Sequence, residues 1–323
     1  MTETNKKYGL ILTYMGGPEN SKEVRPFLSN LFNDPNIIGI PQPIRFLVSR
    51  LIAYGRASKA IEHYNEIGGG SPLKKLTSMQ ANKVAEVIKS RGYNCTVTTG
   101  YSYCNPFIKD SISQFVNGDY EKIISIPLYP QYSITTFGSI ERDLKKAARK
   151  FGLSDRLSIV KPYYNHDLYT RASVELVIKA IEKLDANIPY RVIFTAHALP
   201  QSVIDKGDPY RKQIEEAVAK ILTKCKIDDY VLSFQSKIGP VKWMKPSTVE
   251  TVEKAGTEGI KQLAVIPIGF TCDHVETLHE LDIELAEIAH KAGIDKFVRG
   301  GVFNDHPLFI DLLTELFIGM IDE

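Results

Sequence analysis

The chain has 323 residues, of which 43% are hydrophobic and 24% charged, so it can bury one large core or two ordinary ones and is not a disordered sequence. Its 40 basic and 38 acidic side chains leave a formal charge of +2, which gives no broad electrostatic reason to expect a nucleic acid partner. The polar start of the chain does not resemble a secretory signal, and no apolar run approaches the roughly 18 residues of a membrane span.

The cysteines are scattered along the chain and include no C-x-x-C pair, so neither a zinc ribbon nor a thioredoxin-like site is indicated. Reduced thiols in a cytoplasmic protein are the simplest interpretation. The four residues are Cys95, Cys104, Cys225 and Cys272.

Short runs rich in β-branched and aromatic residues alternate with helical periods throughout the chain. This alternation predicts an α/β architecture with parallel sheets. The predicted strands are Tyr8–Thr13, Thr96–Ser102, Lys122–Leu128, Leu157–Val160, Arg191–Thr195, Tyr230–Ser233 and Gln262–Ile268.

An insertion from Ile40 to Gly70 distinguishes the first half of the chain from the second. Its middle predicts a helix that is apolar over much of its circumference and edged with arginines. Such a helix could lie in a membrane interface, line a large apolar ligand or belong to an ordinary core, and the residues alone leave these alternatives open. The residues concerned are Ile44, Phe46, Leu47, Val48, Leu51 and Ile52, with Arg45, Arg50 and Arg56.

Three glycines, Gly68 to Gly70, precede a predicted helix start. Ser71 suits the N-cap and Pro72 the first helical position, while Gly92 suits the end of the same helix. Backbone N–H groups at such a start can bind an anion. The segment matches neither a Walker loop nor G-x-G-x-x-G, so it supports nucleotide binding only weakly.

The two halves of the chain resemble each other. Leu10–Thr13 and Val192–Thr195 each run into a loop that ends at a proline, and Ile123–Pro127 corresponds to Leu263–Pro267. Ligands of open α/β sheets bind at the carboxyl ends of the strands, so a duplicated doubly wound fold with a ligand cleft is indicated. The alternative is that prolines simply punctuate α/β loops.

His197 follows a predicted strand directly, in the segment Phe194–Pro200. An imidazole, with an ordinary pKa of about 6.5, can accept protons or bind a metal near neutral pH. The alternative is a histidine that only hydrogen-bonds the loop backbone, and the segment alone does not decide between them.

A second polar segment, Phe270–Glu280, also follows a strand and opens a helix. Glu276, Glu280 and Glu284 are spaced four apart on one face of this predicted helix, where like charges repel unless cations or solvent offset them. Together with nearby imidazoles they could form a path for a divalent cation. The alternative for Glu276 is a capping box with Asp273 as the N-cap.

The loop from Gln235 to Thr248 is dense in glycine and proline and contains the only tryptophan, Trp243. A tryptophan in a loop can offer a stacking surface to a flat ligand. It can equally anchor the loop in the core.

Taken together, these passages resemble the ferrochelatases. The matching segments occur in the family's order and cover the chain from about residue 8 to 310. They are Met15–Glu19, Ile67–Pro72, Leu128–Ser133, the His197 segment, Gly207–Tyr210, the Trp243 loop and Asp273–Leu278.

The resemblance implies an α/β fold of two similar doubly wound Rossmann-like halves, whose parallel sheets enclose a porphyrin cleft. The first half would cover residues 1–165, with the lip insertion 40–70, and would be joined by the C-terminal helix 306–323. The second half, 166–305, would carry the metal and proton site.

The activity implied by the resemblance is that of a lyase, which inserts Fe²⁺ into a porphyrin at the end of heme biosynthesis. His197 and Glu276 are implied as catalytic residues and metal ligands that face each other across the cleft. A path for cations or protons through His274, Glu280 and Glu284 would accompany them. The implied porphyrin-binding residues are Met15, Arg56, Tyr64, Ser71, Tyr129, Trp243 and Phe270.

Two departures from the family pattern affect these expectations. Related sequences usually have Arg-Tyr where this chain has Ser102-Tyr103, so one basic contact for the propionates is missing. Some members carry an iron–sulfur cluster on a cysteine-rich C-terminal extension. This chain has no cysteine after Cys272, so we expect no cluster and no other resident cofactor.

The expected porphyrin is protoporphyrin IX, since an apolar lip and few cationic groups suit two propionates better than four. The pattern from Glu276 to Asp282 also resembles the protoporphyrin-using branch of the family. The alternatives are a coproporphyrin III ferrochelatase or a non-catalytic tetrapyrrole-binding protein. The lip could allow peripheral membrane contact of a cytoplasmic protein, and the sequence leaves the oligomeric state open.

Overall fold

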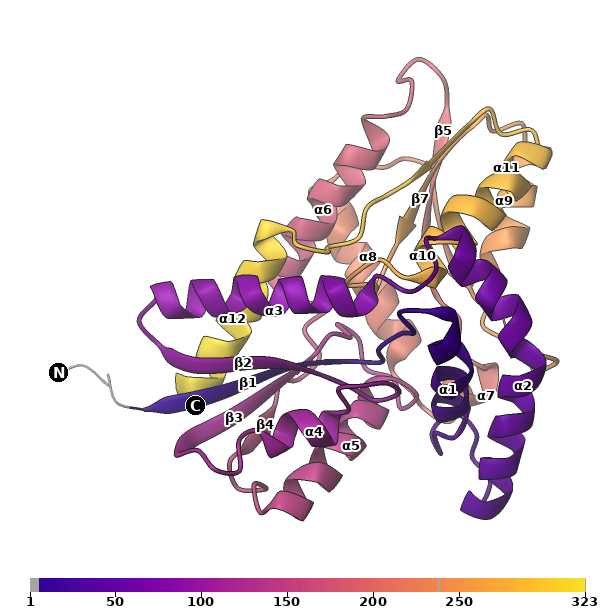
Figure 1. Ribbon diagram of the computed structural model, residues 1–323. Coiled ribbons are helices and arrows are strands. Elements are labelled where there is room, and N and C mark those ends of the chain that lie inside the picture. Colours follow the sequence, from indigo (N-terminus) through magenta and orange to yellow (C-terminus); the bar gives the residue numbers. More distant parts are fainter. Residues whose placement is uncertain (1–5, 238, 323) are drawn as a thin grey trace. The chain divides into compact units, whose positions relative to one another are not determined.

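The computed structural model describes residues 6–237 and 239–322, so Ile238 of the Trp243 loop lies outside the described residues. The chain divides into two compact units (Figure 1). The first unit comprises Met1–Pro162 with Asn304–Glu323, and the second comprises Tyr163–Phe303.

Each unit contains a parallel sheet, and within the described residues each sheet has four strands. The strand orders β2-β1-β3-β4 and β6-β5-β7-β8 are the same order repeated. This confirms the predicted α/β class with two Rossmann-like halves. The strands are β1 Lys7–Tyr14, β2 Asn94–Tyr101, β3 Tyr120–Pro127, β4 Leu157–Ile159, β5 Tyr190–His197, β6 Tyr230–Gln235, β7 Gln262–Pro267 and β8 Lys296–Arg299.

The helices connect these strands in the right order for parallel pairing, which requires a crossover after each strand. None of the helices in the described ranges has the combination of length and apolarity needed to cross a membrane. Their bounds are α1 Ser21–Phe32, α2 Gln42–Glu66, α3 Leu73–Ser90, α4 Ile108–Ser113, α5 Phe137–Phe151, α6 Asp167–Ile181, α7 Gln201–Asp205, α8 Tyr210–Lys224, α9 Thr248–Thr257, α10 Val275–Leu278, the π-helix η1 Glu280–Leu285, α11 Ala286–Lys291 and α12 Pro307–Asp322.

Main-chain hydrogen bonds show how closely the two units repeat each other. The N–H of Leu128 donates to the carbonyl of Thr13 at 2.7 Å, and the N–H of Ile268 donates to the carbonyl of Thr195 at 2.7 Å. Both bonds join the end of the third strand of a unit to the end of its first strand. The predicted internal correspondence is therefore confirmed at the strand ends, where ligands of such sheets bind.

The chain exchanges one helix between the units. Helix α6 follows β4 of the first unit but belongs to the second unit, where it packs against α8. Helix α12 follows β8 of the second unit but belongs to the first, where it packs against α3 and β3 (Figure 1).

Each unit has its own apolar core, built as the sequence pattern requires. Ile11 and Ile123 of the first sheet pack with Leu144 of α5, and all three are buried. In the second unit Val192 and Phe194 of β5 pack with Ile214 of α8. Close packing of this kind holds the strand ends rigidly, so side chains at those ends have fixed positions.

Candidate active site

His197 and Glu276 form a hydrogen-bonded pair in the second unit. His197 is the last residue of β5, and Glu276 lies on α10, which follows the neighbouring strand β7. The His197 Nδ1 and Glu276 Oε2 atoms are 2.9 Å apart, and the side chains are 32% and 24% exposed. The expectation that these groups face each other across a space is therefore wrong, because they are in direct contact.

The pair is electrostatically coupled. Burial alone would lower the pKa of His197, but the charge of Glu276 and the hydrogen bond to it outweigh burial and raise this pKa. Burial would likewise raise the pKa of Glu276, but His197 lowers it to about 2. Glu276 is therefore an ionised acceptor and the Nδ1–H of His197 is the donor, which leaves Nε2 of neutral His197 with a free lone pair.

His274, not Asp273, caps α10. Its Nδ1 accepts a hydrogen bond from the N–H of Glu276 at 3.1 Å, and its own N–H donates to Thr277 Oγ1 at 3.1 Å. Burial is the main cause of the lowered pKa of His274, which is consistent with a neutral ring that accepts at Nδ1. The capping-box alternative for the Glu276 carboxylate is wrong, since that carboxylate binds His197 instead.

Glu280 is held by Ser236, which the sequence analysis did not identify. Ser236 donates its N–H to Glu280 Oε1 at 2.7 Å and its O–H to Oε2 at 2.5 Å. Burial and the charge of Glu276 raise the pKa of Glu280 to about 7, against the lowering effect of the Ser236 hydrogen bonds. Ser236 adopts a φ of 67°, a conformation that costs energy in a residue with a Cβ and often occurs at functional sites.

Gln235 connects the same strand end to α10. Its Nε2 donates to the main-chain carbonyl of Glu276 at 2.9 Å, and its Oε1 accepts from Thr195 Oγ1 at 3.0 Å. Consecutive residues at the end of β6 therefore hold the backbone of Glu276 and the carboxylate of Glu280.

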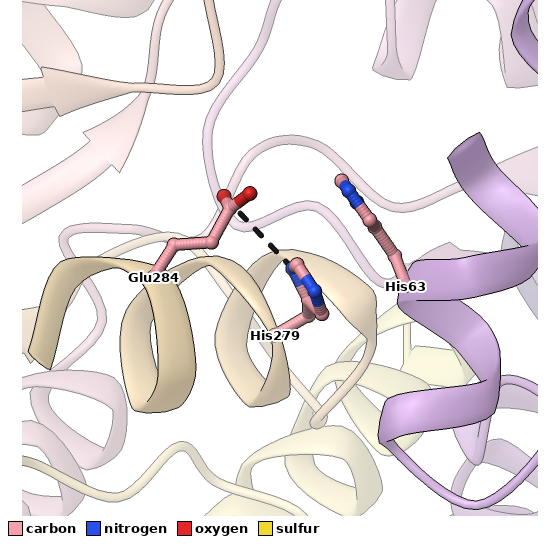
Figure 2. A group of neighbouring side chains, drawn as sticks. All are labelled: His63, His279 and Glu284. Atoms are coloured by element: carbon pink, nitrogen blue, oxygen red, sulfur yellow. Dashed lines mark ion pairs between the residues drawn. The ribbon is translucent and has the colours of Figure 1, made fainter. Parts of the chain in front are cut away.

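The acidic ladder spans two kinds of helix, with Glu276 on α10 and both Glu280 and Glu284 on the π-helix η1. After α10 the chain forms the π-helix η1, in which the N–H groups of Ile283 and Glu284 both donate to the carbonyl of His279, at 3.1 and 3.0 Å. Figure 2 shows Glu284 paired with His279, whose Nδ1 is 3.9 Å from Glu284 Oε2. The three carboxylates thus have different partners: His197 for Glu276, Ser236 for Glu280 and His279 for Glu284.

Two apolar candidates, Phe270 and Trp243, belong to the second unit. Phe270 is 6% exposed, and its ring centroid is 5.3 Å from that of His274. Trp243 is partly buried and packs against the core of the second unit. Its loop is fixed by hydrogen bonds from Gln201 N–H to the Lys242 carbonyl at 2.8 Å and from Met244 N–H to the Leu199 carbonyl at 3.1 Å. Trp243 therefore has a fixed place at the margin of this core.

In the first unit, Met15 and Tyr129 follow the adjacent strands β1 and β3 and so lie at the same edge of the sheet. The Met15 carbonyl accepts from the N–H of Tyr103 at 3.1 Å, and the rings of Tyr129 and Tyr14 meet edge to face at 4.7 Å. Ser71 is buried just before α3, where its Oγ accepts from the N–H of Leu73 at 3.3 Å.

Arg56 and Tyr64 lie on α2, away from the ends of the strands in sequence. The guanidinium of Arg56 lies over the ring of Phe32, 5.9 Å from its centroid, and Tyr64 is 6% exposed. The two residues are therefore placed by α2 and not by the sheet.

Solved structures identify the class of this fold. SirB from Bacillus subtilis with Fe³⁺ covers 98% of this chain and 98% of its own, with a TM-score of 0.57 and 13% identity. CbiX, described as the terminal enzyme for siroheme biosynthesis in denitrifying bacteria, covers 98% and 99%, with a TM-score of 0.52 and 12% identity. The fold is that of the chelatases.

Sequence comparison is more specific. A family model described as Ferrochelatase matches residues 7–320. The Ferrochelatase of Gloeothece citriformis is 39% identical over 98% of this chain and 83% of its own length. That of Geotalea daltonii is 39% identical over 97% of both chains. The chain belongs to the ferrochelatase family, and it is a lyase of heme biosynthesis whose substrates are a porphyrin and iron.

Proposed function

We propose that this ferrochelatase converts protoporphyrin IX and Fe²⁺ to protoheme, with His197 as the acceptor of the pyrrole protons. The observation that carries this proposal is the hydrogen bond between His197 Nδ1 and Glu276 Oε2 at 2.9 Å. A carboxylate on one imidazole nitrogen orients the ring and makes the other nitrogen more basic.

The reaction replaces two pyrrole protons with one Fe²⁺, so the enzyme must accept two protons for each heme formed. Nε2 of neutral His197 accepts the first, and the ionised Glu276 stabilises the imidazolium that results. The raised pKa of His197 favours this transfer but also means that the ring must be deprotonated before each turnover.

Glu280 is suited to pass protons onward. Its pKa of about 7 lets it gain and lose a proton near neutral pH, and Ser236 holds both of its carboxylate oxygens. We assign to Glu276, Glu280, Glu284 and His274 the path by which protons or Fe²⁺ exchange with solvent. His197 and Glu276 would also be the residues that bind Fe²⁺ during insertion.

Apolar side chains would favour a bent porphyrin, in which the nitrogen lone pairs are accessible to the metal. Rigid surfaces that fit a bent ring better than a flat one lower the barrier by differential binding. We assign this role to Met15, Tyr129, Trp243 and Phe270, and the binding of the propionates to Arg56, Tyr64 and Ser71.

The preference for protoporphyrin rests on the apolar lip and on Ser102, which stands where related sequences usually have an arginine. Arg142 already binds two carboxylates, with Nη1 2.5 Å from Asp34 Oδ1 and Nη2 2.8 Å from Asp143 Oδ1. Because its guanidinium is already paired with Asp34 and Asp143, Arg142 is poorly suited to bind the extra propionates of coproporphyrin. A buried carboxylate without a partner is costly.

Helix α2 would supply peripheral membrane contact for a cytoplasmic enzyme. Its apolar side chains point outward: Ile44, Leu47 and Leu51 are 56%, 63% and 73% exposed. The guanidinium of Arg50 lies 4.2 Å from the ring centroid of exposed Phe46. Exposed apolar residues beside arginines suit a lipid interface, which would deliver an apolar porphyrin.

The test is anaerobic insertion of Fe²⁺ into protoporphyrin IX and coproporphyrin III under matched detergent conditions. We expect kcat/KM to favour protoporphyrin. A clear preference for coproporphyrin III would reject the substrate proposed here, although the enzyme would remain a ferrochelatase.

A further inference from the structure

The lip helix α2 is held in an unusual way. Of its residues, all of which the structure describes, the buried ones are Arg45, Ser49, Ala53 and Tyr64. Its large aliphatic side chains are exposed or only half-buried. Burial of apolar surface is the usual means of fixing a helix in place. Since α2 packs against α1 with few fully buried aliphatic side chains, polar contacts can add to its fixation.

One such contact joins α2 to the loop that precedes it. Arg45, which is 8% exposed, donates from Nε to the carbonyl of Asn33 at 3.0 Å and from Nη1 to the carbonyl of Ile40 at 2.6 Å. It also donates to the side chain of Gln42. A single guanidinium thus binds both ends of the loop between α1 and α2.

The start of that loop is fixed to the rest of the first unit by Asp34. Its side chain is fully buried and accepts from Arg142 Nη1 at 2.5 Å, Arg142 Nη2 at 3.0 Å, Tyr103 Oη at 2.8 Å and the N–H of Asn36 at 2.8 Å. Arg142 lies on α5, and Tyr103 follows β2. We refer to Asp34, Arg142 and Tyr103 as the Asp34 clamp.

The electrostatics of the clamp support a permanent ion pair. Burial alone would raise the pKa of Asp34, but the hydrogen bonds and charge of Arg142 hold it below its ordinary value. Burial and the charge of Asp34 raise the pKa of Tyr103 well above its ordinary value, so its O–H remains a donor. A bidentate guanidinium–carboxylate pair fixes direction as well as distance.

We propose that Asp34 and Arg142 are positioning residues for porphyrin binding: through the loop and Arg45 they hold α2, and with it Arg56 and Tyr64, in place. The inference rests on the proposed role of Arg56 and Tyr64 in holding the porphyrin. Loosening α2 removes binding energy from the bound porphyrin in the ground state and the transition state alike, so it raises KM more than it lowers kcat.

The experiment compares Asp34→Asn, Arg142→Gln and Arg142→Lys with the exposed controls Asp155→Asn and Arg149→Lys, the latter on α5 like Arg142. Hydrogen exchange is measured over residues 42–66 and over β1 in the substrate-free protein. Steady-state kcat and KM are measured with whichever porphyrin the wild type prefers, so a wrong porphyrin assignment does not affect the result.

We expect Asp34→Asn and Arg142→Gln to speed exchange in α2 but not in β1, and to raise KM at least about tenfold with kcat within about threefold, the scale of one lost charge-assisted hydrogen bond. Arg142→Lys keeps the positive charge but cannot bind both carboxylate oxygens of Asp34 as a guanidinium does. Its KM should therefore lie between those of the wild type and Arg142→Gln. The controls should match the wild type.

Several results would overturn the inference. They are unchanged exchange in α2, equal acceleration across the whole first unit, or an unchanged KM despite faster exchange in α2. Should the charged-residue variants fail to fold, Tyr103→Phe removes one donor and keeps the ion pair. It should change exchange and KM in the same direction by about twofold to fivefold, and wild-type values for it would also reject the clamp.

Discussion

The two units share a scaffold but differ in the side chains at the carboxyl ends of their strands. In the second unit, His197 at the end of β5 binds Glu276 on α10, the helix that follows β7, and each shifts the pKa of the other. In the first unit the position equivalent to His197 is Met15, and the segment after β3 begins with Leu128 and Tyr129, so these residues are apolar or aromatic. One copy of the fold thus presents ionisable side chains at its sheet edge, and the other presents apolar and aromatic ones.

The helical segment that follows the third strand also differs between the two units. In the first unit α5 is a regular helix, which ends at Gly152 with a φ of 69°. In the second unit the corresponding segment is α10, the π-helix η1 and α11. Glu280 and Glu284 of this segment bind Ser236 and His279, and π turns are frequent at functional sites. The regular helix carries Arg142, which binds Asp34, while the interrupted one carries Glu276, Glu280 and Glu284.

The largest effect is expected from removing the titrating side chain at the end of β5. His197→Ala should reduce insertion by about 10²- to 10⁴-fold, the usual contribution of a general base. Met15→Leu, at the equivalent place two residues after the corresponding threonine, should leave kcat within about threefold, since a volume-conserving apolar change is well tolerated. Insertion assays measure the rates of both variants, and circular dichroism shows whether both are folded. Activity of the alanine variant within about tenfold of wild type would remove His197 from the mechanism.

The next effect separates the charge of Glu276 from its shape. Glu276→Gln should lower kcat by about 10²-fold, because the neutral amide no longer stabilises the imidazolium. Because the charge of Glu276 raises the pKa of His197, its loss should lower that pKa and move the acidic limb of the pH–rate profile to lower pH. Since the amide can still hydrogen-bond His197, the free energy of unfolding should change by no more than about 1 kcal/mol. An acidic limb that stays in place or moves to higher pH contradicts this account.

The comparison also shows what sequence reasoning can and cannot find. Runs of β-branched residues locate β1 to β7, because such residues suit buried parallel strands. Strand β8 was missed, since it has only four residues and begins and ends with Lys296 and Arg299. Position after a strand was enough to single out His197 as a candidate.

Partners, in contrast, come from folding and not from local pattern. Asp273 and Glu276 match a capping box in sequence, yet the cap is His274, because β5 places His197 beside the Glu276 carboxylate. The left-handed φ of Ser236 has no sequence signal, since it is a serine and not a glycine that adopts it. The Asp34 clamp joins residues more than 60 positions apart, so spacing could not reveal it.

A smaller effect should result from loosening Glu280. The O–H of Ser236 lowers the pKa of Glu280 by donating to its carboxylate. Ser236→Ala and Ser236→Gly both remove this donor, so the pKa of Glu280 should rise above its present value of about 7. If the ionised carboxylate passes protons on, the rate at pH 7 should fall about tenfold and recover at higher pH. The glycine variant should be about 1 kcal/mol more stable than the alanine variant, because glycine adopts a positive φ without strain. Equal pH profiles for both variants and wild type would exclude this role.

The smallest expected effect comes from giving the first unit a new charge at its sheet edge. Ser102 is among the groups that act on the carboxyl of Asp143, whose pKa is raised mainly by burial. Ser102→Arg alone should therefore place the new guanidinium against Asp143 and change the ratio of kcat/KM for coproporphyrin to protoporphyrin by about twofold or less. In the double variant Ser102→Arg, Asp143→Asn that guanidinium is free to bind a propionate, and the ratio should rise about tenfold, the scale of one charged hydrogen bond. Asp143→Asn alone is the matched control, and thermal unfolding shows whether the longer side chain is accommodated. An unchanged ratio in the double variant would mean that residues at this edge of the first unit do not bind the propionates. The preference between the two porphyrins would then depend on the apolar lip instead.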